Sequence, residues 1–260
     1  MKILKKLNTA ALSLNLNLSA IASSLKNLPK YFIDRNRYMK QVDLKKWSFR
    51  SYPMLLDNQS EAASLGEYFW QDLLVAKKII KTNPSKHIDI GSRIDGFIAH
   101  LACVRKVEIF DIRPLTKKIP NVRFKKIDIT NLKQKHKMIA DCVSCLHTLE
   151  HVGLGRYGDN IDIHGWSKAL VSIISIVKPG GLLWLSVPIG LQSVVFNCHR
   201  IFNPVTIIDE AAKFEMKLIN FYYLSDLGIL KSKNFQKDIQ KLSKKKYGLG
   251  IFLFRKKEKK

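Results

Sequence analysis

Three kinds of feature are absent from this sequence of 260 residues or rare in it. No stretch reaches the ~18 consecutive apolar residues that a membrane-spanning helix needs, so no spanning segment is expected. Cysteine is scarce, and four scattered thiols suit a reducing cytosol rather than a disulfide framework. No internal repeat is found either, which excludes a solenoid or propeller built from repeated units.

The cysteines also exclude a zinc site. Cys142 and Cys145 have the spacing of a metal-binding pair, but they lie in residues 138–146, which are predicted to form a strand. Residues three apart on a strand point to opposite faces, so the two thiols cannot hold one metal ion or form a disulfide. No second pair completes a site. We expect no metal.

Acidic residues are nearly absent from the two ends of the chain. Residues 1–50 hold eleven lysines and arginines against two acids, and residues 231–260 hold twelve against two, within a total net charge of +24. Basic ends that only aid solubility, an anionic membrane surface and nucleic acid all remain possible explanations. Nucleic acid is the least favoured, because the charge lies on terminal segments and no RNA-binding module is recognised.

A heptad pattern near the N-terminus predicts a basic amphipathic helix over residues 1–30, ended by Pro29. Its apolar positions step by three and four: Leu4, Leu7, Ala11, Leu14, Leu18, Ile21, Leu25 and Leu28. Such a helix packs, pairs with itself or lies on a membrane. Asparagines at 8, 15 and 17 argue against a signal peptide. We predict a helix and linker over 1–58, a main domain over 59–256 and a basic tail over 257–260.

In the main domain, buried strands alternate with helices. Strands are predicted at 87–90, 107–112, 123–129, 138–146, 182–187, 217–224 and 249–254, and helices at 60–81, 97–102, 164–177 and 204–214. Ser60 is expected to cap the first helix, whose apolar face would be Leu65, Phe69, Leu73, Ala76 and Ile80. Alternation of this kind predicts an α/β fold with a mostly parallel seven-stranded sheet and helices on both faces.

Three successive strand ends carry acids. Asp89 stands before the glycine turn at Gly91, Asp111 ends the next strand, and Asp128 lies near the end of the third. Ligands of such sheets bind outside the carboxyl ends of the strands, so these acids predict a nucleoside pocket. Arg93 and Asp95 disfavour a dinucleotide, because the turn that would receive its pyrophosphate should be bare and not acidic. S-adenosylmethionine, which carries an amino acid in place of phosphate, fits better.

These features resemble class I S-adenosylmethionine-dependent methyltransferases over residues 60–256. The resemblance rests on Asp89-Ile90-Gly91, Asp111, Asp128-Ile129, Leu149-Glu150-His151 and Lys178-Pro179-Gly180-Gly181. More closely, the chain is similar to an uncharacterised bacterial branch met near surface-polysaccharide genes, through Gly153-Leu154-Gly155-Arg156-Tyr157-Gly158-Asp159 and Phe196-Asn197-Cys198-His199-Arg200. The resemblance implies a Rossmann-like fold and a cofactor site built from Asp89, Gly91, Arg93, Asp95, Asp111, Asp128 and Ile129.

Transfer of a methyl group to a hydroxyl also calls for a general base. The candidates are His147, Glu150, His151 and His199, of which we favour His151 as the base and Glu150 as its orienting partner; a buried structural role is the alternative for each histidine. Residues 153–159 are predicted to form a lid or acceptor loop, unless they are a plain connection. Acceptor contacts are expected from Arg156, Tyr157, His199 and Arg200, although a capping or surface role for the two arginines stays open.

The sequence therefore predicts a methyltransferase that acts on a small-molecule or glycan acceptor, in surface-polysaccharide biosynthesis. We expect it in the cytoplasm, at the periphery of the inner membrane, and as a homodimer. A nicotinamide-dependent oxidoreductase is disfavoured by Arg93 and Asp95. A non-catalytic partner of a membrane-associated biosynthetic complex, which keeps the sheet but has lost the cofactor, is the main alternative.

Overall fold

The computed structural model describes residues 18–46, 48–55, 65–225 and 228–258. The chain divides into two compact units, Met1–Ser64 and Leu65–Lys260. Ser60, expected to cap the first helix of the main domain, lies outside the described residues, as do Leu4, Leu7, Ala11 and Leu14 of the heptad pattern.

The first unit contains the helix α2 (Leu18–Met39), which continues through Pro29. The prediction that Pro29 ends the helix is therefore wrong, because α2 runs on to Met39. Proline removes one backbone donor, but the returning chain contacts the helix on both sides of it: Asn27 Nδ2 donates to the Leu55 carbonyl at 2.7 Å, and Arg35 Nε donates to the Ser51 hydroxyl at 2.8 Å. Two residues of the expected apolar seam are exposed, Ile21 by 47% and Leu25 by 65%.

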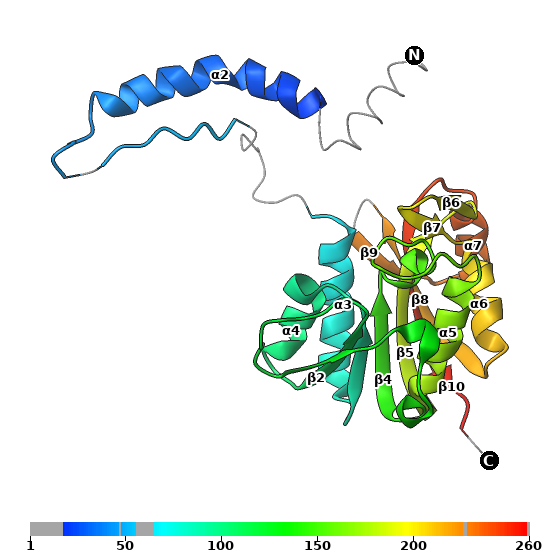
Figure 1. Ribbon diagram of the computed structural model, residues 1–260. Helices are drawn as coiled ribbons and strands as arrows, with labels where there is room; N and C mark the ends of the chain where they lie inside the picture. The colour runs from blue at the N-terminus through cyan, green and yellow to red at the C-terminus, as the bar shows by residue number, and fades with distance from the viewer. Residues whose placement is uncertain (1–17, 47, 56–64, 226–227, 259–260) are drawn as a thin grey trace. The chain divides into compact units, whose positions relative to one another are not determined.

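The second unit holds the remaining elements (Figure 1). The helical segments are α3 (Glu67–Thr82), η1 (Ile94–Ile98), α4 (Ala99–Ala102), η2 (Ile129–Asn131), η3 (Gln134–His136), η4 (Leu149–His151), α5 (Gly165–Ile176), α6 (Pro204–Ala212) and α7 (Phe235–Leu242). The strands are β1 (His87–Ile90), β2 (Val107–Asp111), β3 (Val122–Lys126), β4 (Ala140–Leu146), β5 (Val177–Ile189), β6 (Ser193–Val195), β7 (His199–Ile201), β8 (Met216–Ser225), β9 (Gly228–Lys231) and β10 (Gly248–Lys256).

The main sheet has the strand order β3-β2-β1-β4-β5-β10-β8-β9. The first five strands pair in parallel, and β10, β8 and β9 add antiparallel pairs. The predicted α/β fold with a mostly parallel sheet is therefore confirmed. The number of strands differs, because β9 makes an eighth strand. It is only four residues long, too short for a clear alternating pattern.

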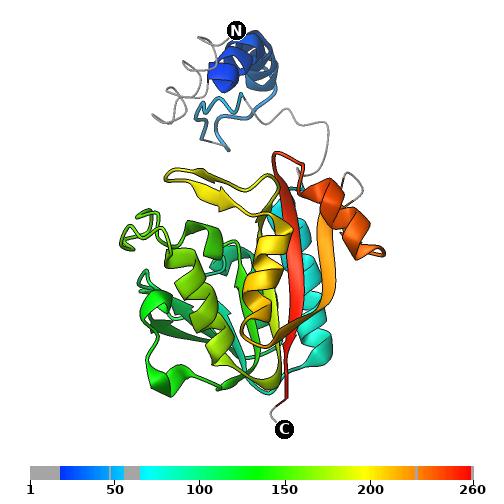
Figure 2. The same cartoon turned by 90° about the vertical axis from the view of Figure 1, so that its right-hand side faces the viewer.

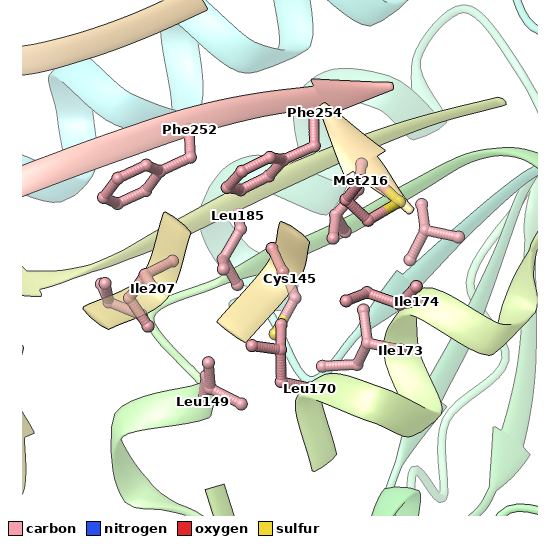
Figure 3. Close-up of a cluster of buried hydrophobic side chains, with 14 of the residues drawn as sticks. Cys145, Leu149, Leu170, Ile173, Ile174, Leu185, Ile207, Met216, Phe252 and Phe254 are labelled. Carbon is pink, nitrogen blue, oxygen red and sulfur yellow. The ribbon is translucent and has the colours of Figure 1, made fainter. Parts of the chain in front are cut away.

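Two apolar clusters cover the two faces of the sheet. Residues of α5, α6 and α7 pack on one face, and residues of α3, η1 and α4 pack on the other (Figure 2). Cys145 lies in the first cluster, among Leu149, Leu170 and Leu185 (Figure 3), whereas Cys142 lies in the second. The prediction that these two thiols point to opposite faces is confirmed, and both are free.

The buried face of α3 differs from the predicted one. Of the predicted face only Ala76 is buried. Leu65, Phe69, Leu73 and Ile80 are 40–47% exposed, and the helix buries Gln71, Asp72, Val75 and Ile79 in their place. The reason is a polar contact that periodicity cannot show. Ser186 of β5 donates to Gln71, and Gln71 Nε2 donates to Asp72 at 3.0 Å. These bonds rotate the polar residues toward the sheet and leave the larger apolar ones at the surface.

Smaller differences concern ends of elements. Residues 178–181 do not separate a helix from a strand, because α5 ends at Ile176 and β5 begins at Val177. At the start of α6, the Asn203 side chain caps the helix by accepting from the Val205 N–H, with Pro204 in the first turn. Within the described residues, no helix is long and apolar enough to cross a membrane.

Candidate functional site

A pocket lies where the strand order reverses, between β1 and β4. In open α/β sheets, ligands bind at this switch point, outside the carboxyl ends of the strands. The pocket has a volume of about 890 Å³, which includes its open mouth. It is lined by Tyr68, Ile90, Gly91, Arg93, Phe110, Asp111, Ile112, Arg113, Ile127, Asp128, Ile129, His147, Thr148, His151, Val152, Tyr157 and Asp159.

The glycine turn after β1 needs its glycine. Gly91 has a φ of 66°, in the left-handed region, and its N–H donates to the Phe110 carbonyl at 2.9 Å. A Cβ at this position would lie 2.6 Å from Thr148 Cγ2, so a larger residue meets both strain and a clash. Gly91 therefore lets β1 and the loop after β4 approach each other at the pocket wall.

Asp89 does not line the pocket. Its carboxylate is fully buried and accepts hydrogen bonds from the Ser92 N–H at 3.0 Å, the Ser92 hydroxyl at 2.7 Å and the Ser144 hydroxyl at 2.5 Å. Burial raises the pKa of Asp89 to about 6, and these hydrogen bonds oppose the rise. Asp89 therefore stabilises the turn through Ser92. The sequence had predicted that it contacts the cofactor.

Arg93 and Asp95 form a pair of their own. The guanidinium donates to the carboxylate at 3.1 and 2.8 Å, and lies 5.1 Å from the ring centre of Tyr68. Arg93 and Tyr68 line the pocket, whereas Asp95 does not and its side chain is 73% exposed. The hydrogen bond from Arg93 lowers the pKa of Asp95. Asp95 thus neutralises Arg93 from outside the site.

Asp111, one of the acids predicted for the nucleoside pocket, already has a hydrogen-bonding partner. The Arg113 N–H and Nε donate to Oδ1 at 2.8 and 3.1 Å, and Nη2 donates to Oδ2 at 2.7 Å. The guanidinium also lies 4.9 Å from the ring centre of Tyr157. Since an ionised carboxylate offers about four acceptor positions, Asp111 keeps little capacity for a ligand while Arg113 stays in place.

Asp128 and Ile129 end the apolar side of the pocket. Asp128 Oδ1 caps the η2 turn by accepting from the Thr130 N–H at 2.9 Å and the Thr130 hydroxyl at 2.7 Å. Ile129 is buried beside it. The surrounding wall is aliphatic and aromatic, with Ile90, Phe110, Ile112 and Ile127. This side suits a flat heteroaromatic ring with one polar edge.

The β4 side carries the histidines. His147 has a φ of 51°, uncommon for a residue other than glycine, and places its Nδ1 2.8 Å from Glu150 Oε1. Glu150 is 1% exposed, and its Oε2 has no hydrogen-bond partner. Burial lowers the pKa of His147, but the hydrogen bond and the charge of Glu150 outweigh it, and the pKa is raised. Glu150 is therefore bonded to His147, where sequence paired it with His151.

His151 is oriented by a main-chain group. Its Nδ1 donates to the Cys198 carbonyl at 2.7 Å, which leaves Nε2 as the acceptor nitrogen of the neutral ring. Nε2 lies 3.7 Å from Glu150 Oε1, and the side chain is 14% exposed where it lines the pocket. Burial lowers the pKa of His151, so that the neutral form with a free Nε2 prevails at pH 7.

The glycine-rich loop is held by one carboxylate. Asp159 accepts from the N–H groups of Gly153, Gly155 and Tyr157 at 2.7, 3.3 and 3.1 Å. Burial raises the pKa of Asp159, but these three hydrogen bonds lower it below its ordinary value. The loop is therefore an ordered wall of the pocket, to which it contributes Tyr157 and Asp159.

Three of the expected acceptor residues lie outside the pocket lining. Arg200 is 6% exposed and donates to the carbonyls of Glu150, Val152 and Asp162, at 3.4, 2.6 and 3.5 Å. Arg156 donates to the Cys198 carbonyl at 3.1 Å. Both arginines join the β6–β7 hairpin to the loops after β4, and the guanidinium of Arg200 is bonded to main-chain carbonyls outside the pocket lining. His199 instead contacts Cys198 Sγ at 3.2 Å.

Several lining residues were not predicted as site residues: Tyr68, Phe110, Arg113, Thr148, Val152 and Asp159. Arg113 had a signal, because an arginine two residues after the strand-end acid can fold back onto it. Tyr68 had none, since it reaches the site from a helix that precedes β1. In the part of the chain that the structure describes, no three His, Cys, Asp or Glu side chains gather as a metal site.

Comparison with known proteins gives a family and a fold. A family model described as "Caenorhabditis protein of unknown function, DUF268" matches residues 104–249, which is more than half of the chain. No curated protein matches the sequence.

Two solved structures share the architecture. An N-methyltransferase, NodS from Bradyrhizobium japonicum WM9 in complex with S-adenosylhomocysteine, matches with 13% identity over 83% of this chain and 97% of its own, at a TM-score of 0.51. A 1,6-didemethyltoxoflavin-N1-methyltransferase from Burkholderia thailandensis, with bound 1,6-didemethyltoxoflavin and S-adenosylhomocysteine, matches with 13% identity over 72% and 79%, at 0.50. The fold is that of class I methyltransferases, as predicted.

Proposed function

The chain belongs to the family that the DUF268 model describes, and we propose that it is an S-adenosylmethionine-dependent methyltransferase. The observation that carries the proposal is the pocket at the β1/β4 switch point. It has an aliphatic wall for a ring, an acid at the end of β2, a glycine turn and a neutral histidine. The two similar structures are methyltransferases with S-adenosylhomocysteine bound.

Residues of the pocket offer suitable groups for the adenine, the ribose and the carboxylate of this cofactor. The wall of Ile90, Phe110 and Ile127 would hold the adenine, and Asp128 lies at its polar edge. Asp111 would accept the ribose hydroxyls, in competition with Arg113. Arg93 at the pocket wall offers a cation to the methionine carboxylate. When bound, S-adenosylmethionine supplies an electrophilic methyl group on a sulfonium.

His151 acts as the general base in this proposal. The Cys198 carbonyl fixes its tautomer, so that Nε2 accepts the proton of the acceptor hydroxyl. Glu150, 3.7 Å from that nitrogen, stabilises the imidazolium that results. Glu150 also forms a hydrogen bond with His147, so a buried pair of opposite charge lies next to the base when His147 is protonated.

The acceptor is a small molecule or glycan that carries a hydroxyl, in surface-polysaccharide biosynthesis. Support for this finer part comes from motif resemblance in residues 153–159 and 196–200, both of which contribute to the β4 side of the site. The small molecule 1,6-didemethyltoxoflavin, bound in the Burkholderia thailandensis structure, is consistent with an acceptor of modest size.

Titration calorimetry with S-adenosylmethionine and S-adenosylhomocysteine tests the proposal. We expect binding of both, and a loss of about tenfold or more in affinity for Asp111→Asn, which removes a charge-assisted acceptor. Glu210→Gln is the matched control, because this acid pairs with Lys213 and does not line the pocket. No heat with either ligand, in protein that melts cooperatively, would refute the assignment.

A second function has one observation in its favour. Arg113 holds Asp111 by three hydrogen bonds, as in a protein that has closed its ribose subsite. The chain would then be a non-catalytic partner in a membrane-associated biosynthetic complex. Arg113→Ala separates the two functions: a methyltransferase binds S-adenosylmethionine before the substitution, whereas a closed remnant binds it only afterwards or not at all.

A further inference from the structure

We propose that an apolar rim at the mouth of the pocket docks on an anionic lipid surface. The apolar rim consists of six exposed side chains, two from the loop after β4 and four from the segment after β5 that includes β6: Ile161, Ile163, Leu191, Val194, Val195 and Phe196. Neither the family match nor the proposed chemistry requires such a surface.

The exposure of the apolar rim is high for large apolar side chains. Ile161 and Ile163 are 71% and 76% exposed, Phe196 is 70% exposed, and the other three range from 45% to 58%. Single exposed apolar residues are ordinary, but a contiguous group marks an interaction surface. The rim therefore calls for a partner that buries it.

Hydrogen bonds from two arginine side chains to main-chain carbonyls hold the two parts of the apolar rim together. Arg200 in β7 donates to the Asp162 carbonyl, between the two rim isoleucines, at 3.5 Å. Arg156 donates to the Cys198 carbonyl, two residues after Phe196, at 3.1 Å. The buried Arg200 and the short distances make one surface of both loops, beside the His151 that also bonds to Cys198.

The topology puts the apolar rim at the pocket end of the sheet. The first loop follows β4 and the second follows β5, whose carboxyl ends lie at the same edge of the sheet as the pocket. The hairpin of β6 and β7 is a separate two-stranded ribbon, and the whole of β6 is exposed. Figure 2 shows this hairpin projecting beyond the main sheet.

A basic loop flanks the apolar rim. Lys244, Lys245 and Lys246 are exposed between α7 and β10. The Leu191 N–H donates to the Lys245 carbonyl at 2.8 Å, which fixes this loop to the base of the hairpin. Among the residues that the structure describes, no carboxylate forms an ion pair with these three lysines.

Apolar side chains beside unpaired lysines match an anionic bilayer surface. The side chains enter the boundary of the acyl region, and each lysine near the lipid phosphates adds attraction of ~1 kcal/mol. A second copy of this chain is a poorer occupant, because docking of rim on rim would bring two such lysine loops together in a molecule of net charge +24. On a membrane, the mouth of the pocket faces the lipid surface.

Vesicle flotation of the full chain tests this surface. The probes are phosphatidylcholine vesicles with and without about 30% phosphatidylglycerol, which supplies the anionic charge. We expect the wild-type chain to float with the anionic vesicles. Phe196→Ser together with Ile163→Ser should lower the partition coefficient by about tenfold or more, since two large apolar side chains no longer enter the bilayer.

Charge and position need matched controls. Lys244→Glu with Lys246→Glu should lower partition about tenfold, whereas Lys217→Glu with Lys257→Glu, at the opposite edge of the sheet, should change it less than about twofold. Val104→Ser removes an exposed apolar side chain far from the rim in the sequence and should leave partition unchanged. Residues 1–50 are identical in all variants, so differences report on the rim.

Two results would overturn the proposal. One is equal flotation of the rim variants and the wild-type chain, which would place lipid binding elsewhere or in bulk charge. The other is a wild-type dimer that the rim variants convert to a monomer without a change in partition, which would make the rim an interface between copies. Circular dichroism melts of each variant confirm that folded protein is compared, and Ile163→Ser alone serves if the double variant unfolds.

Discussion

The two sides of the pocket hold their polar groups in different ways. On the side of β1, β2 and β3, each charged group is bonded to a residue two positions away: Arg93 to Asp95, Arg113 to Asp111 and Thr130 to Asp128. On the side of β4 and β5, some partners are local, such as His147 and Glu150, but others come from far along the chain. His151 and Cys198 are 47 residues apart, and Tyr247 and Glu67 are 180 apart.

This difference indicates which hydrogen bonds can break without destabilising the fold. A local pair at the surface can open without disturbing the fold, so the β1–β3 side can release Asp111 to a ligand. The distant contacts of the β4–β5 side are also the contacts that hold the loops after β4, β5 and α7 in place. The charged pairs of the β1–β3 side can therefore rearrange around a ligand, whereas the side chains of the β4–β5 side are held in place by the tertiary structure.

Removal of Arg200 should have the largest effect on stability. Arg200→Ala leaves three carbonyl groups without their donor, in a position that is 6% exposed. We expect the free energy of unfolding to fall by about 3 kcal/mol, because a buried polar group without a partner costs ~1–3 kcal/mol. Urea denaturation measures it.

Arg113→Ala is the matched variant on the other side of the pocket, where the pair is local and half exposed. We expect a loss of less than about 1 kcal/mol. Equal losses for Arg113→Ala and Arg200→Ala would break the distinction between the two sides.

Gly91→Ala tests the point where the two sides meet. We expect a loss of about 2 kcal/mol in the free energy of unfolding, from a left-handed φ of 66° and from the clash with Thr148 Cγ2. Thr148→Ser removes that methyl group. Added to Gly91→Ala, it should restore part of the loss in a thermal melt, and a double variant no better than Gly91→Ala would exclude the clash as a cause.

Glu150→Gln tests whether the Glu150 carboxylate raises the pKa of His147, on the β4–β5 side of the pocket. The Glu150 carboxylate keeps the pKa of His147 raised against burial, so we expect that pKa to fall below its ordinary value in the variant. Titration of the imidazole signals by NMR, with His147→Asn for assignment, measures the shift. An unchanged His147 signal would mean that Glu67 or Asp72 sets its charge.

The raised pKa of His147 also makes the free energy of unfolding depend on pH. A histidine whose pKa is raised in the folded state adds stability that is complete below its unfolded pKa of about 6.5 and is lost as pH rises through the folded value. Between pH 6 and 8, the free energy of unfolding of the wild-type chain should therefore fall more steeply than that of Glu150→Gln. Urea denaturation across this range checks the sign.

Asp95→Ala should have the smallest effect. Its pair with Arg93 is exposed, and such pairs contribute ~0–1 kcal/mol. We expect a change in unfolding free energy below about 0.5 kcal/mol, which differential scanning calorimetry can bound. A loss as large as that of Arg200→Ala would show that Asp95 organises the glycine turn.

Sequence patterns determined the parts of this protein that depend on neighbours in the chain. The buried runs at β1, β2, β4 and β5, the opposite faces of Cys142 and Cys145, the cap at Asn203 and the acids at strand ends follow from side chains a few positions apart. From these, the α/β fold and the position of the pocket could be predicted, because parallel strands bring their carboxyl ends to one edge.

The tertiary structure decided everything that rests on partners distant in sequence. It turned α3 so that Gln71 meets Ser186 of β5, oriented His151 by a carbonyl 47 residues away and buried Arg200 among main-chain oxygens. Periodicity reports which face of an element is apolar, but it carries no information about which polar groups meet once elements pack. A buried polar group must find a partner, and only the packed fold shows which one.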